Sequence, residues 1–311
     1  QEKERLEIMN VHIVLFLVSL FYGILFSWAG EIMPQYLSAE SLVWMRVTFA
    51  ALIFQVIGLI YYSKNKVDWK TDWKTFAICG FFGTSANMYL FFKGLEMTHP
   101  INAAVLMLLA PLFVALFDHI RLNRIPTVVF SIALFIAAIG CIQLIGEKGL
   151  SFQSETIMGD IWVGVNAIFY AIYLVKVKSL TQKYPAFVIN RWTFSFGWLY
   201  ITPIGLLPFF GTDFNVIPSA IVFKIGYILV VMSFLVYFMN AYAIQKSGPT
   251  LTGVYIYLQP LLASIIAVFL GTDELSFKKA ILIILVLVSV FIATKNSPSQ
   301  LRVIANSGEK N

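Results

Sequence analysis

Two arginines lie inside long apolar stretches, where a charged side chain is costly to place. Arg46 falls in the stretch at residues 41–62, and Arg191 falls in the stretch at residues 186–208. A cation in hydrocarbon costs several kcal/mol unless it finds a partner, so an intramembrane arginine is first read as a functional group. We expect one of the two to bind a substrate carboxylate or to hold a gate. The alternative is that both side chains snorkel to an interface.

Amide and phenol side chains recur at helical spacing in other apolar stretches. These polar positions are Thr84 and Asn87; Asn102; Asn166, Tyr170 and Tyr173; Ser233, Tyr237 and Asn240; and Thr252, Tyr255 and Gln259. Amides and phenol hydroxyls can replace the hydration of a small polar or zwitterionic solute, while aromatic rings cover its apolar part. We predict that they converge on one cavity. The alternative assigns the aromatic residues to interfacial belts and the amides to contacts between helices.

Two prolines fall near the middle of apolar stretches, Pro111 in residues 99–118 and Pro260 in residues 249–270. Each removes a backbone donor and frees the carbonyl four residues earlier, at Met107 and Ile256. We predict bends around the cavity that act as hinges, with simple packing bends as the alternative.

The positions of the acidic residues and histidines do not favour a proton relay or a metal site. The acidic side chains in or next to the apolar stretches lie near their ends: Glu31, Glu96, Asp118, Asp160 and Glu274. A buried carboxylate relay is therefore not indicated. The three histidines are far apart, so no metal site is expected, and no cofactor motif or phosphate-binding loop occurs. We expect a protein that is not an enzyme and has neither cofactor nor metal.

The elements that must position these groups are membrane helices. Hydrophobic residues make up 59% of the 311 positions and charged residues 12%, a balance far from that of soluble domains. Ten apolar stretches are each long enough to cross a bilayer. They are residues 10–29, 41–62, 74–92, 99–118, 126–145, 158–177, 186–208, 218–243, 249–270 and 277–294. Their continuous apolar character predicts an all-α membrane protein of ten transmembrane helices rather than a barrel.

The net charge of +6 is explained by topology rather than by a nucleic-acid partner. The N-terminus and every second loop hold fifteen cations: Lys3, Arg5, Lys64, Lys66, Lys70, Lys74, Arg121, Arg124, Lys176, Lys178, Lys183, Lys246, Lys295, Arg302 and Lys310. The other loops hold four: Lys93, Lys148, Lys278 and Lys279. Cytoplasmic loops retain Lys and Arg, so both termini should be cytoplasmic, as an even number of helices requires.

The two halves of the chain repeat each other. At a constant offset of 149, five residues of the first half recur as identical residues in the second: Pro100, Val105, Leu109, Pro111 and Leu112. Arg46 matches Arg191 at an offset of 145. Five helices per half is an odd number, so the second half should enter from the opposite side, as in secondary transporters with inverted repeats. We predict repeats at residues 1–146 and 147–295 and a flexible cytoplasmic tail at residues 296–311.

Several of these residues resemble one family. They are the helix-2 and helix-7 arginines, Gly23 in the segment 20–23, the segment 255–260 with its Tyr-Ile-Tyr-Leu-Gln-Pro sequence, and the segment 269–276. With the repeat boundaries, they resemble the EamA-type members of the drug/metabolite transporter superfamily. The resemblance implies a ten-helix carrier, commonly an exporter of amino acids or other small metabolites in a bacterial inner membrane. It also favours a monomer, because both inverted halves lie in one chain.

We therefore expect a secondary transporter whose partners are a small-molecule substrate and the lipid bilayer. A flippase for a lipid or lipid-linked sugar is the main alternative, since Arg46 in a lateral opening could accept a phosphate. A membrane enzyme or receptor would need an ionisable cluster at one interface. A groove open to lipid would favour the flippase, and a closed central cavity would favour the solute carrier.

Overall fold

The computed structural model describes residues 2–61, 66–121, 123, 125–145, 155–240, 242–243 and 255–295. Throughout those ranges the regular structure is helical and contains no strand. The predicted tail at 296–311 and the start of the ninth predicted helix at 249–254, which carries Thr252, lie outside the described residues.

The described residues of the first half form five helical spans. They are α1 (Glu2–Ile32), α2 (Ala39–Tyr61), α3 (Trp69–Gly80) continued by the π-helix η1 (Phe81–Ser85) and α4 (Ala86–Met97), α5 (Pro100–Leu106) followed by α6 (Leu109–Arg121), and α7 (Val128–Ile145). The second half contains α8 (Glu155–Thr181), α9 (Ala186–Phe210), the short 3-10 turn η3 (Phe214–Val216), α10 (Ser219–Tyr227) continued by the π-helix η4 (Ile228–Leu235), α12 (Gln259–Phe269) and α13 (Phe277–Lys295).

Each predicted apolar stretch overlaps one of these spans within the described residues. Within the described residues, seven helical spans are long and apolar enough to cross a membrane, and α7 and α12 contain shorter apolar helices. Large apolar side chains on the outer surface are exposed, for example Phe135 on α7 and Ile284 on α13, which are 67% and 58% exposed. Water would penalise such a surface, whereas lipid accommodates it.

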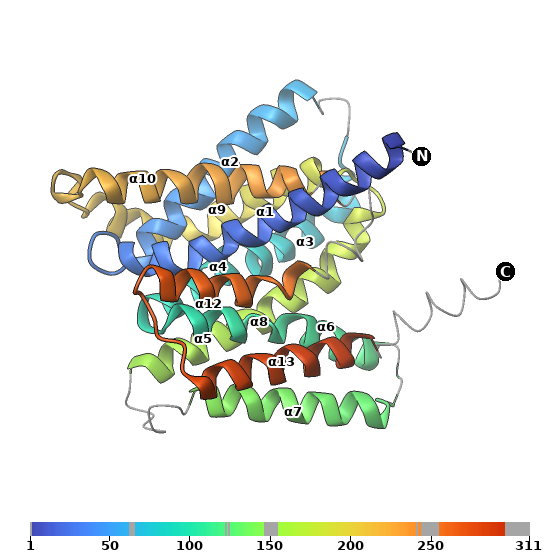
Figure 1. The fold of residues 1–311 in the computed structure, drawn as a ribbon. Helices are drawn as coiled ribbons and strands as arrows, with labels where there is room; N and C mark the ends of the chain where they lie inside the picture. Colours follow the sequence, from blue (N-terminus) through green and yellow to red (C-terminus); the bar gives the residue numbers. More distant parts are fainter. Residues whose placement is uncertain are drawn as a thin grey trace.

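The helices pack as a bundle in which equivalent spans of the two halves meet (Figure 1). The second spans of the halves, α2 and α9, lie against each other, and so do the fifth spans, α7 and α13. In addition, α4 packs on α8, while α1 packs on α12 and η4. This exchange of neighbours between halves is what a duplicated bundle produces. In Figure 1, α1 begins and α13 ends at the same end of the bundle.

We call the opposite end the predicted outer end. It carries the connections from α1 to α2, α4 to α5, α9 to α10 and α12 to α13 (Figure 1).

Departures from regular α-helix occur at matching places in the two halves. The π-helices η1 and η4 interrupt the third and eighth spans. The fourth span breaks at Met107 and Leu108, and the chain turns at Tyr257 and Leu258 immediately before α12. Because a π turn or a break leaves backbone groups for other partners, these positions offer extra hydrogen-bonding groups inside the bundle.

The two prolines do not lie inside continuous helices, and that expectation is corrected. Pro111 is the third residue of α6 and Pro260 is the second residue of α12, so both occupy a first helical turn. Proline is favoured there because its missing N–H would have no intrahelical acceptor. The Met107 carbonyl accepts a bond from the Ala110 N–H at 3.1 Å. The role of Pro111 and Pro260 as hinges stays a prediction.

Close packing of α4 on α8 yields the first testable expectation. A Cβ added at Gly94 would lie 2.7 Å from the Gly159 carbonyl oxygen and 3.0 Å from the Val163 nitrogen, so backbone blocks it. We expect Gly94→Val to lower stability by about 1–3 kcal/mol through overpacking, seen as a lower melting temperature in detergent. Gly164→Ala is the control, because a Cβ there meets nothing within 4 Å. Equal melting temperatures for the two variants would contradict this packing.

Candidate functional site

Arg46 on α2 is buried in the interior, with 4% of its surface exposed. Its Nε donates to the Ser233 hydroxyl at 3.2 Å, and its Nη2 donates to the Met232 carbonyl at 3.2 Å. Both acceptors belong to η4, the π-helix of the eighth span. The guanidinium also lies 5.5 Å from the ring centre of Phe92. The side chain therefore points into the bundle and does not snorkel to an interface.

The hydrogen bonds of Arg46 leave part of its guanidinium unused. A guanidinium carries five N–H donors, and only two bonds from Arg46 are present in the described part of the chain. No acidic side chain among the described residues lies within ion-pairing distance of it. A buried cation without a counter-ion is costly, so this group has both the charge and the spare donors to bind an anion.

Two phenols lie near this cation, and a third lies near those two. Tyr22 on α1 and Tyr237 in the eighth span lie close enough to Arg46 to interact with it electrostatically. Tyr170 on α8 is similarly close to both Tyr22 and Tyr237. All three keep some accessible surface although they lie within the bundle. We call Tyr22, Arg46, Tyr170, Ser233 and Tyr237 the central cluster.

One wall of the central cluster is aromatic. The Tyr237 ring lies edge-on to Phe54 and Phe194, with centroid distances of 5.9 Å and 5.3 Å. Phe54 and Phe194 stack on each other at 5.4 Å. Tyr170 stacks on Tyr173 at 5.8 Å. Phe54 and Phe194 are fully buried and support the wall from behind, whereas Tyr170 and Tyr237 keep accessible surface that can cover an apolar or a cationic group.

Asn87 and Asn166 lie together between α4 and α8. The Asn166 amide donates to the Asn87 carbonyl at 2.5 Å, and the Asn87 amide donates to the Asn166 carbonyl at 3.5 Å. The Asn166 Oδ1 atom is enclosed without a partner. Because Asn166 and Tyr170 are one turn apart on α8, this pair lies near the central cluster.

Arg191 has a different environment, despite its matching position in the repeat. Its Nε donates to the Gln55 side-chain oxygen at 2.8 Å, and Gln55 donates to the Ser195 hydroxyl at 2.7 Å. The guanidinium lies 4.9 Å from the ring centre of Trp192, and its stem packs on Gly58. The side chain thus joins α9 to α2 and has no described contact with the central cluster.

Other predicted site residues are spread along the bundle. The Tyr255 hydroxyl is hydrogen-bonded to His12 at 2.8 Å, near the start of α1. Asn240 is the last residue of its described helical segment, and Gln259 is the first residue of α12. No described contact joins these three residues to Arg46. Asn102 lies at the predicted outer end, beside Asp160.

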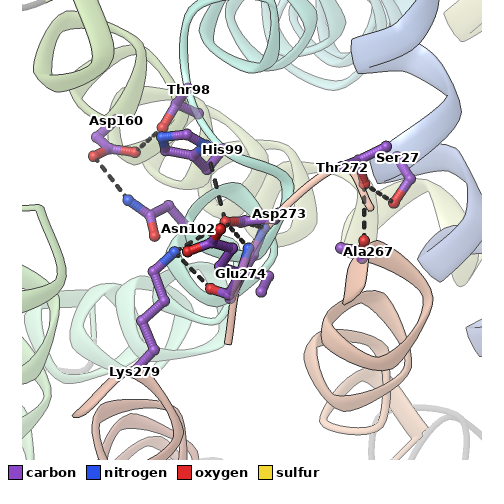
Figure 2. Close-up of polar contacts among 11 residues, drawn as sticks. Ser27, Thr98, His99, Asn102, Asp160, Ala267, Thr272, Asp273, Glu274 and Lys279 are labelled. Carbon is purple, nitrogen blue, oxygen red and sulfur yellow. Dashed lines mark hydrogen bonds and ion pairs between the residues drawn. The ribbon is translucent and has the colours of Figure 1, made fainter. Parts of the chain in front are cut away.

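The predicted outer end holds a polar network that sequence reasoning missed (Figure 2). The Asp273 carboxylate accepts bonds from the Lys279 ammonium at 3.0 Å and from the Ile101 N–H at 3.2 Å, and it lies 3.9 Å from His99. The Asp273 and Lys279 side chains are 3% and 7% exposed. Their contacts connect the α12–α13 connection to the start of α5.

Asp160 is the second feature of this network, and its burial is not foreseen from its position near a helix end. It is completely buried, at 0% exposure. It accepts bonds from the Thr98 hydroxyl and from the Asn102 amide, the latter at 3.3 Å. Nearness to a helix end is a poor guide to exposure where a neighbouring connection folds over that end.

Further ion pairs surround the same end. Lys93 pairs with Glu96 at 2.7 Å and with Glu40 at 3.3 Å, while Lys224 pairs with Glu31. The last two pairs link helices, joining α4 to α2 and α10 to α1. The predicted outer end is therefore closed by several charged contacts between helices.

A smaller cluster lies at the opposite end of the bundle. Asp72 accepts bonds from Lys183 at 2.9 Å and from the Tyr184 hydroxyl at 2.7 Å. The hydrogen bond to Asp72 raises the pKa of Lys183 above its ordinary value. Burial, followed by the hydrogen bond to Asp72, raises the pKa of Tyr184. This cluster joins α3 to the connection between α8 and α9.

Known proteins resemble the chain over nearly its whole length. The model of the EamA-like transporter family matches it twice, at residues 9–146 and 157–295. A Bacillus subtilis protein described as the uncharacterized transporter YyaM is 24% identical over 281 residues, covering 89% of this chain and 92% of that one. A Salmonella typhimurium protein described as the uncharacterized inner membrane transporter YicL is 23% identical and covers 86% and 88%. A solved crystal structure matches with a TM-score of 0.61 at 19% identity, covering 93% of this chain and 98% of that one.

The apolar helices and these relatives define a multi-pass membrane transporter. The chain belongs to the EamA-like transporter family, which confirms the resemblance seen in the sequence. The solved structure supports the fold alone.

The contact of Arg191 with Gln55 gives the second prediction. Arg191→Met removes the donor and leaves the Gln55 oxygen unpaired in the seam between α2 and α9. We expect a loss of about 1–3 kcal/mol, measured as a lower melting temperature. Adding Gln55→Leu should recover part of the loss, because the unpaired oxygen is then absent. Strictly additive effects in this double-mutant cycle would contradict a direct interaction.

Proposed function

We propose that this protein is a secondary transporter that exports a small metabolite bearing a carboxylate, such as an amino acid or a related compound. Arg46 would bind the carboxylate, and the phenols and rings of the central cluster would hold the rest of the solute. The observation that supports this most directly is the incomplete pairing of buried Arg46.

The chemistry of the central cluster suits such a solute. A planar guanidinium can donate two parallel bonds to a carboxylate, which makes arginine selective for this group. Tyr22, Tyr170 and Tyr237 bring hydroxyls that donate or accept hydrogen bonds. The partly accessible rings of Tyr170 and Tyr237 offer faces for an ammonium or an apolar side chain.

Transport would follow alternating access. The central cluster lies between the halves, since Arg46 belongs to the first and Ser233 to the second. The charged contacts at the predicted outer end and the Asp72 cluster at the other end would open in turn. Export across a bacterial inner membrane, with both termini cytoplasmic, is part of the proposal. It rests on the distribution of Lys and Arg between loops.

The flippase alternative receives less support from the burial of Arg46. A flippase that uses Arg46 for a lipid phosphate needs the side chain to be reachable from the bilayer. Arg46 is 4% exposed and faces η4, so it is enclosed by helices. The same burial supports a solute site enclosed by protein.

Ligand binding tests the proposal directly. Amino acids, amines, nucleosides and lipid phosphates should be screened for their effect on the melting temperature of the purified protein, because a ligand that binds only the folded state raises it. We expect a rise with a carboxylate-bearing class. Arg46→Gln should weaken binding of that class roughly tenfold or more, as expected for lost bonds to a charged group.

Arg191→Gln is the matched comparison, since it removes a second intramembrane arginine outside the central cluster. Its melting temperature should still rise with the same solutes. A rise seen only with lipid phosphates, or an unchanged affinity in Arg46→Gln, would refute a carboxylate site at Arg46. Once the screen has identified a solute, its exchange across the membrane of reconstituted vesicles would test transport itself.

A further inference from the structure

Asp160 is a buried carboxylate with no ion-pair partner among the residues that the structure describes. It lies on α8 at 0% exposure, and its oxygens accept bonds from Thr98 and Asn102 (Figure 2). Neither partner is charged. Because an ionised carboxylate away from water is strongly disfavoured without a counter-charge, this group has a physical need for a cation.

The nearby charged groups are occupied with one another. Lys279 is the cation that interacts electrostatically with Asp160. Its ammonium is bonded to the Asp273 carboxylate at 3.0 Å and to the Glu274 carbonyl at 3.1 Å. His99 lies 3.9 Å from the same Asp273 carboxylate. No ion pair to Asp160 occurs among the described residues, so Lys279 attracts this carboxylate only from a distance.

A second, independent observation is an unused oxygen on the amide group whose nitrogen contacts the carboxylate. Asn102 is 96% buried, since its exposure is 4%, and its Oδ1 atom has no hydrogen-bond partner. Its amide nitrogen is bonded to Asp160, so the unpaired oxygen belongs to a side chain already in contact with the acid. A buried acceptor without a partner is unfavourable, and a cation bound at Asp160 would satisfy it once the amide turned its oxygen toward the carboxylate.

We propose that Asp160, Thr98 and Asn102 form a binding site for one monovalent cation, either a proton or Na⁺. The carboxylate, hydroxyl and amide oxygens are the hard donors that bind Na⁺, and the carboxylate alone can take a proton. In either case the bound charge neutralises Asp160. The site lies where α4 ends and α5 begins, at the predicted outer end.

The position of this site links the cation to opening of the bundle. Thr98 and Asn102 belong to the first half and Asp160 to the second, so their bonds cross between halves at the predicted outer end. Separating them would leave an ionised carboxylate without its donors, whereas a neutralised one separates at lower cost. Use of the site for ion coupling rests on the proposed transport function; cation binding itself does not.

Binding can be measured on the purified full-length protein without any solute. Saturable binding of radioactive Na⁺ and infrared titration of protonated carboxylic groups should be compared in wild type and Asp160→Asn. We expect the variant to lose all saturable Na⁺ binding if the ligand is Na⁺. It should lose one titrating carboxyl, insensitive to Na⁺, if the ligand is a proton.

Two further variants serve as controls for the effect of Asp160→Asn. Glu155→Gln removes an exposed carboxylate from the same helix and should keep the wild-type signal. Thr98→Val keeps the carboxylate and removes one oxygen, so it should weaken Na⁺ binding about tenfold or displace the titration midpoint. It tests the site even if Asp160→Asn fails to fold.

The inference is overturned if the wild-type protein shows neither signal, or if the signal persists in Asp160→Asn. A failed solute screen with an intact cation signal would count against the proposed function and leave this site standing. Solute binding without any cation signal would support the proposed function and count against this site.

Discussion

Lipid offers no hydrogen-bond partner to a peptide group, so a chain that crosses a bilayer must satisfy its backbone within the protein. This chain departs from the α-helix at η1, at η4 and at the breaks before Pro111 and Pro260. At η4 the departure has a clear use. The Met232 carbonyl of this π-helix accepts the bond from buried Arg46, and the adjacent Ser233 hydroxyl accepts another. The altered helix therefore creates the polar surface that an intramembrane arginine requires.

The same constraint applies to charged side chains. Some of them are paired inside the protein, whereas two of them lack a charged partner among the described residues. Lys279 and Asp273 neutralise each other although both are nearly enclosed. The Arg191 Nε atom donates a hydrogen bond to Gln55. Arg46 and Asp160 have neutral partners only within the described residues. Buried charges with incomplete pairing lower the stability of the protein. Arg46 and Asp160 are therefore the groups at which a bound ligand could supply the missing charge.

Hydropathy and spacing predict the helical architecture because the bilayer imposes a length on each apolar stretch. Arg46 could be singled out for a related reason, since its charge conflicts with the residues around it. The partners of Arg46 and Arg191 could not be predicted in this way. The two arginines are equivalent in the repeat, but one faces η4 and the other faces α2, which depends on how the helices pack. Tyr22 lies close to Arg46 for the same reason, through the placement of α1.

Asp160 shows where distance along the sequence misleads. Its place near the start of α8 suggests an exposed position, yet Thr98 and Asn102 from the α4–α5 region cover it. Exposure at a helix end depends on connections that lie far away in the sequence, and their path is not encoded in local hydropathy.

The predicted outer end is closed by contacts of two kinds. Partly exposed pairs such as Lys93–Glu40 contribute little and can break readily. The buried contacts of Asp160 and Asp273 are harder to separate because each leaves a charge without its donors. Opening of this end should therefore be governed by the buried carboxylates, which are the groups whose charge a bound cation can change.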